Sequence, residues 1–114
     1  MIGGNITAHV LQYDDTLRNE IGEIKGIWKP THQKLTGWLD LMSADTDHGL
    51  MKTIVQESTH VFIMDYLPNV SMKSKNNRLV INDRTYEVIY QDDPMELHEH
   101  IEIFLKYLGE EYAS

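Results

Sequence analysis

Cysteine is absent from the 114 residues of this chain. Its absence excludes disulfides, thiolate nucleophiles and zinc sites built on cysteine pairs. Long apolar runs are also missing, since no window approaches the roughly 18 apolar residues that indicate a membrane-spanning helix. The first residues, M-I-G-G-N-I-T, lack the basic segment and apolar stretch of a secretory signal. We therefore expect a soluble protein that is not exported by such a signal.

Basic residues are few, with 10 Lys and Arg against 18 Asp and Glu and a formal net charge of -8. An acidic surface repels phosphate backbones, so specific nucleic-acid binding is not expected. A negatively lined passage would still let DNA slide past without adhering. The length predicts a single domain over 1–114, with flexible ends at 1–4 and 110–114.

A β-hairpin is predicted over Arg78–Tyr90, read as R-L-V-I-N-D-R-T-Y-E-V-I-Y. Apolar residues alternate with more polar ones on both sides of a short break, which is placed at Asn82-Asp83 or at Asp83-Arg84. In either register the same apolar side chains share one face: Leu79, Ile81, Tyr86 and Val88. Because an isolated hairpin is marginal in water, other strands must cover that face.

Further strands are predicted in the first half of the chain. Asn5–Tyr13 alternates as a strand with both faces partly covered. Glu23–Lys34 contains Pro30, which donates no ladder hydrogen bond, so this run is expected at an edge or a bulge. Gly37–Met42 is too short for its period to separate strand from helical turn.

The middle of the chain resumes the β pattern over Met51–Tyr66. Sixteen residues is long for one strand, so the run either bends near Glu57-Ser58 or crosses the whole domain. Leu67–Asn77 is expected to be a turn and an exposed connection. The polar segment between these elements, S-A-D-T-D-H-G at Ser43–Gly49, is expected to be a long mobile loop.

The C-terminal segment carries conflicting signals. Asp93-Pro94-Met95-Glu96 has the cap, proline and acidic residue of a helix start, and propensity alone favours a helix. Residues 100–107 instead alternate at strand period.

Chemistry-bearing motifs are weak in this sequence. His98 and His100 would share a side of a strand and, with His60 or Glu57, offer a metal site. No phosphate loop, nucleophile elbow or fixed third metal ligand accompanies them, so we expect no enzyme, no cofactor, no catalytic residue and no metal ligand. Trp28 is expected in the core, whereas Trp38, beside the polar loop, is divided evenly between core and contact surface.

Five blocks together resemble the head-tail joining proteins of tailed bacteriophages, also called head-closure, head-completion or stopper proteins. The blocks are G-W-L-D-L-M-S at 37–43, Q-E-S-T-H-V-F-I-M-D-Y at 56–66, the hairpin at 78–90, D-P-M at 93–95 and H-I-E-I-F-L-K-Y-L-G at 100–109. They span about 5–109, and the middle and last blocks are the most specific.

The resemblance implies a mainly β domain, a single small β-barrel or sandwich of about six to seven antiparallel strands, with a strand at about His98–Tyr107. It implies a virion structural protein, made in the bacterial cytoplasm, that forms a ring between the portal or adaptor complex and the tail proteins and retains packaged DNA. The channel or stopper loop would comprise Ser43, Ala44, Asp45, Thr46, Asp47, His48 and Gly49. Trp38 and Met42 would be interface residues.

Two other interpretations are kept. The first is a different phage connector, such as an adaptor or tail-completion protein, although adaptors of this assembly are generally helical. The second is a small metal-binding β-barrel enzyme, for which the histidines are the only support.

Overall fold

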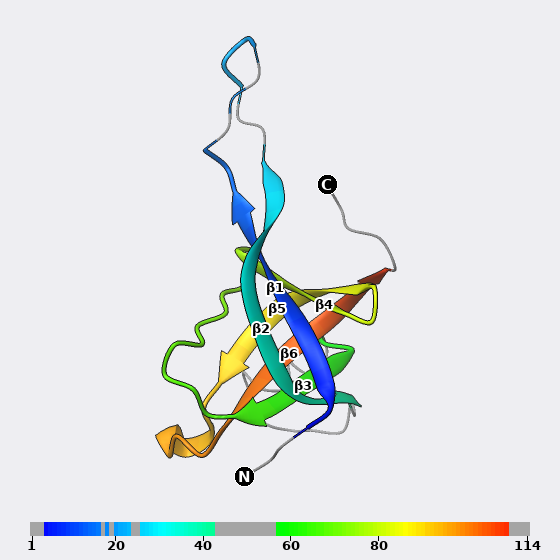
Figure 1. Cartoon of the computed structure of the whole chain (residues 1–114), viewed down its shortest axis with the longest axis vertical. Helices are drawn as coiled ribbons and strands as arrows, with labels where there is room; N and C mark the ends of the chain where they lie inside the picture. The colour runs from blue at the N-terminus through cyan, green and yellow to red at the C-terminus, as the bar shows by residue number, and fades with distance from the viewer. Residues whose placement is uncertain (1–3, 17, 19, 24–25, 43–56, 110–114) are drawn as a thin grey trace.

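Six antiparallel strands and one short 3-10 turn form the domain. The computed structural model describes residues 4–16, 18, 20–23, 26–42 and 57–109. The sheet closes on itself in the order β1-β2-β3-β6-β5-β4 (Figure 1). The elements are β1 Ile6–Asp14, β2 Ile27–Leu41, β3 His60–Asp65, β4 Asn77–Ile81, β5 Arg84–Asp92, η1 Pro94–Glu96 and β6 His100–Gly109. This closed, mainly β architecture is the fold class that the sequence predicts.

The hairpin β4–β5 forms as predicted, with its loop at Asn82-Asp83 because Ile81 pairs with Arg84. Both loop residues have left-handed φ, 51° at Asn82 and 64° at Asp83. Asn and Asp tolerate this conformation, and it matches the turn to the twist of the strands.

The interior of the barrel is filled by alternate residues of every strand. Residues of the hairpin's apolar face, including Leu79, Tyr86 and Val88, are at most 2% exposed. The core cluster consists of Ala8, Val10, Leu35, Phe62, Met64, Val70, Met72, Leu79, Ile81, Tyr86, Val88, Ile101, Ile103 and Leu105.

β2 is one continuous strand of 15 residues, where the sequence suggested two separate segments. It pairs with β1 over most of its length and with β3 only over Trp38–Leu41. Pro30 lies opposite Leu11, beside a register shift that follows His9. The prediction that Pro30 marks an edge or bulge is therefore confirmed.

The paired ends of β1 and β2, Gln12–Asp14 with Ile27–Lys29, rise above the barrel in Figure 1 and are called the arm. Tyr13 and Trp28 pair across it, with ring centroids 5.2 Å apart. Within the arm, Ile27–Lys29 of β2 pairs with β1 alone among the described strands.

The connection between β3 and β4 is exposed over most of its length, as predicted, yet two of its side chains are buried and close one mouth of the barrel. Val70 and Met72 point inward and are only 5% and 7% exposed. Gln91 on β5 holds them, because its side-chain oxygen accepts the Met72 N–H at 2.7 Å and its amide donates to the Val70 carbonyl at 3.0 Å.

The C-terminal segment is the strand β6, which pairs with β3 and β5. The helix-start signal at Asp93-Pro94 is confined to η1, whose Met95 has φ 57°. Leu97 and Leu108, needed for a helical stripe, are 57% and 41% exposed, whereas Ile101, Ile103 and Leu105 are buried. Pairing on both sides overrides the local helix preference.

Candidate interaction surfaces

The exposed rim where β2 ends carries Trp38, which is 44% exposed, and Leu41, which is 78% exposed. Gly37 and Leu39 point inward, so Trp38 lies on the outer face between them. Its strand partner is Ile63 on β3. Trp38 is therefore exposed and lies outside the core, and its role in an interface stays a prediction.

Met42 follows the strand and is half-buried. Its N–H donates to the carbonyl of Thr59 at 2.9 Å, and the N–H of Thr59 donates to the carbonyl of Leu105 at 2.8 Å. These bonds fix both bases of the connection between β2 and β3 against the barrel. The predicted channel loop, Ser43 to Gly49, lies outside the described residues, as do residues 50–56.

The three histidines of the metal hypothesis are separated by the fold. His60 pairs with Leu105, whereas His100 lies five residues earlier on β6, a separation of roughly 16 Å at the usual rise per strand residue. His98 precedes β6 and contacts Asp93, while His100 contacts Glu102 at 3.2 Å. Within the described part of the chain, no group of three or more His, Asp or Glu side chains is placed to hold a metal ion.

His60 instead packs on aromatic rings at the end of the barrel where β3 begins. Its ring meets Tyr86 edge-on at 5.1 Å between centroids and lies 6.4 Å from Tyr107. Burial lowers the pKa of His60, and the positive charge of Arg84 lowers it further. These contacts are those of a packed histidine that is held neutral.

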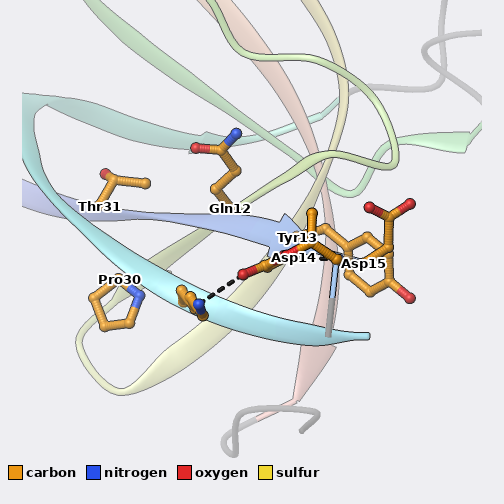
Figure 2. Close-up of a pocket in the computed structure, with 8 residues that line it drawn as sticks. Gln12, Tyr13, Asp14, Asp15, Pro30 and Thr31 are labelled. Carbon is orange, nitrogen blue, oxygen red and sulfur yellow. Dashed lines mark hydrogen bonds and ion pairs between the residues drawn. The ribbon is translucent and has the colours of Figure 1, made fainter. Parts of the chain in front are cut away.

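A hollow of about 590 Å³ opens at the base of the arm. Figure 2 shows the side chains of its labelled residues around it. Lys29 and Asp14 form an ion pair at 2.6 Å, drawn there as a dashed line. Hydrogen bonds from Lys29 and from Thr16 hold the pKa of the Asp14 carboxyl well below its usual range. The lining residues are Gln12, Tyr13, Asp14, Asp15, Thr16, Lys29, Pro30 and Thr31.

The hollow has no arrangement for nucleophilic or acid–base catalysis among its lining residues. Asp14 and Lys29 neutralise each other, and the only hydroxyls are those of Tyr13, Thr16 and Thr31, with no imidazole beside them. A hydroxyl nucleophile needs an adjacent base that is itself held in place.

Arg78 and Trp28 form a second feature that sequence reasoning missed. Trp28 is half-buried on the outside of the barrel, although it was expected in the core. The guanidinium of Arg78 stacks on the Trp28 ring. Two buried nitrogens of Arg78, Nε and Nη1, have no hydrogen-bond partner among the described residues. Burial lowers the pKa of Arg78, while Glu87 opposes this shift. No local sequence signal pairs these residues, because β1 lies between their strands.

No family model matches the chain, and no curated protein matches it either. Among solved structures it is similar to the solution structure of protein SF1141 from Shigella flexneri 2a, with a TM-score of 0.64. The match has 15% sequence identity and covers 94% of this chain and 95% of that one. At this identity the likeness shows the fold alone. The fold defines the class, a small closed domain of six antiparallel strands, and no helix of the described residues is long and apolar enough to span a membrane.

Proposed function

We propose that this protein is a structural virion component that joins the DNA-filled head of a tailed bacteriophage to its tail. Copies would form a ring beneath the portal and its adaptor, close the head channel and retain packaged DNA until the tail attaches. The resemblance of the five sequence blocks supports this proposal. The mainly β fold is compatible with it and is not specific to it.

The observation that carries the proposal is the rim at the end of β2, where Trp38 and Leu41 are exposed and Met42 is half-buried. Tryptophan and methionine are enriched where proteins dock, and Trp38 is 44% exposed. Met42 is hydrogen-bonded to Thr59 at the base of the connection between β2 and β3. The rim would therefore present the segment 43–49 from a fixed point on the ring.

The negative charge of the chain is compatible with a protein that lies beside DNA without binding it. With a net charge of -8, a ring of copies would repel the phosphate backbone. DNA would then pass through the channel without adhering, and retention would depend on steric closure by the segment 43–49. Partners in this role are further copies, the portal or adaptor complex and the tail proteins.

Electron microscopy of particles assembled without this coding sequence tests the proposal. The expected result is full-sized heads beside detached complete tails, with DNA leaking from the heads. Normal infectious particles would refute the role. Complementation with Trp38→Ala should lower the fraction of joined particles about tenfold, as for an interface hot spot. Asp40→Ala is the control, because Asp40 lies on the same outer face of β2 and is also exposed.

A further inference from the structure

The turn between β5 and β6, Asp93–Glu99, presents two large apolar side chains to solvent. Met95 is 86% exposed and Leu97 is 57% exposed. Figure 1 shows η1 at the lower end of the molecule, far from the arm. An exposed Met beside an exposed Leu is costly to keep in water unless another surface covers it. We call this segment the acidic turn.

The acidic turn is held in one conformation by side chains. Met95, Glu96 and His98 have left-handed φ of 57°, 55° and 55°. Asp93 accepts a hydrogen bond from the N–H of His98 at 3.0 Å and also contacts its ring. The ring of Tyr66 lies 4.5 Å from that of His98. Because these contacts restrain the turn before it docks, they lower the ordering entropy that docking would cost.

Charge around the turn has one sign. Between Asp92 and Leu105 the sequence has five carboxylates and no Lys or Arg: Asp92, Asp93, Glu96, Glu99 and Glu102. The surface that covers Met95 should therefore be apolar at its centre and basic at its edge.

The chain itself has a cavity with a basic edge. This cavity of about 390 Å³ lies between β1, β2 and the connection that closes the barrel mouth. Its lining is mostly uncharged and polar, includes Lys73 and contains no carboxylate, while Val10 and Met72 at its floor are only 2% and 7% exposed. Lys75 is exposed and lies next to the lining residue Asn76. We call this cavity and its lysines the lysine hollow.

Other cavities of the molecule do not fit an acidic partner. The hollow at the base of the arm has Asp15 beside the neutralised pair of Asp14 and Lys29, and the cavity beside the β4–β5 loop has Asp83 and His9 in its lining. Residues 66–82, which form one wall of the lysine hollow, contain three basic residues and no Asp or Glu. Charge complementarity therefore favours the lysine hollow as the surface that receives the acidic turn.

We propose that the acidic turn of one copy docks into the lysine hollow of a second copy. Met95 enters the cavity, and Glu96 and Glu99 face Lys73 and Lys75. Because the turn and the hollow are different surfaces of one chain, the contact is heterologous and repeats from copy to copy. This contact would join neighbouring copies in the ring of the proposed function. The contact itself does not depend on that function, whereas the closure of the copies into a ring does.

Charge reversal with exchange of partners tests this contact in purified protein, by sedimentation at low salt. Wild type should associate with rising concentration, and added salt should weaken the association. The double variants Glu96→Lys/Glu99→Lys and Lys73→Glu/Lys75→Glu should each associate at least about tenfold more weakly. An equimolar mixture of the two should recover the association, since each turn then meets a hollow of opposite charge.

A matched control for Glu96→Lys/Glu99→Lys is Asp15→Lys/Glu20→Lys, which makes the same charge change at exposed positions beyond the arm. It should associate at least as well as wild type. Wild type that stays monomeric at every concentration, or variants that do not recover on mixing, would overturn the contact. Circular dichroism checks that each variant is folded. Because no phage assembly is involved, this failure is distinct from failure of the proposed function.

Discussion

The guanidinium carbon of Arg78 lies 4.1 Å from the centroid of the Trp28 ring. Arg78 is on β4 and Trp28 on β2, so the contact ties the base of the arm to the barrel across β1. Two buried nitrogens of the guanidinium have no hydrogen-bond partner among the described residues, so the Trp28 ring and the charge of the cross-strand neighbour Glu87 compensate for its burial.

Trp28→Ala should lower the free energy of unfolding by about 2 kcal/mol, because it removes apolar area and leaves the guanidinium uncovered. Arg78→Met should change it by less than about 1 kcal/mol, since the unpartnered nitrogens go with the charge. Urea denaturation of both single variants and the double variant should give a coupling of about 1 kcal/mol. Strict additivity would show that the stacked pair contributes nothing.

Gly37 is required by close packing of backbone in the barrel wall. A Cβ at this position would lie 2.2 Å from the carbonyl oxygen of Ile63 on β3. Gly37→Ala should therefore lower the free energy of unfolding by about 3 kcal/mol, the upper range for overpacking. The neighbour Thr36 is exposed, and Thr36→Ala should cost less than about 0.5 kcal/mol. Equal stability of the two variants in chemical denaturation would contradict the packing argument.

Gln91 holds the segment that closes the barrel mouth, through its bonds to Met72 and Val70. Gln91→Leu should lower the free energy of unfolding by about 2 kcal/mol, because the Met72 N–H and the Val70 carbonyl lose their hydrogen-bond partner. Amide hydrogen exchange at Met72 should accelerate in this variant. Gln12→Leu, an exposed position on β1, should leave that exchange unchanged. Unaltered protection of Met72 in Gln91→Leu would mean that the core contacts hold the segment alone.

Asp92 predicts a dependence of stability on pH. Burial raises the pKa of this carboxyl, and Glu102, which pairs with it across β5 and β6, and Asp93 raise it further. Because the folded protein holds this proton more tightly than the unfolded chain, stability falls as pH rises from the ordinary value of 3.8 through the raised pKa. Asp92→Asn should therefore be more stable than wild type at pH 7, with a difference that shrinks towards pH 3.8.

Asp14→Asn should have the opposite effect on stability to Asp92→Asn, since Lys29 lowers the pKa of Asp14 and favours its charged form. This variant should be less stable than wild type at neutral pH, and the difference should fade as acid protonates the wild-type carboxyl. Thermal unfolding of both variants across the acidic range measures the two trends. A pH-independent difference for Asp92→Asn would exclude the carboxylate pair as its cause.

Local chemistry of the sequence determined the β4–β5 hairpin. Alternation chose the inward residues, and the tolerance of Asn82 and Asp83 for left-handed φ placed the loop. The rim residue Trp38 could be nominated from the sequence because it flanks a polar segment, although its exposure could not. The loop that follows it lies outside the described residues, so the prediction for Ser43–Gly49 stays a prediction.

Contacts between distant segments decided the rest. The C-terminal segment has a helix start at Asp93-Pro94, yet it extends because β3 and β5 both offer unpaired backbone to it. Val70 and Met72 look like loop residues until Gln91, some twenty positions later, holds them in the barrel mouth. Arg78 meets Trp28 only because β1 brings their strands to either side of it. Periodicity and turn chemistry act over a few residues and are readable in the sequence, whereas closure of the sheet depends on pairings between distant segments that only the tertiary structure specifies.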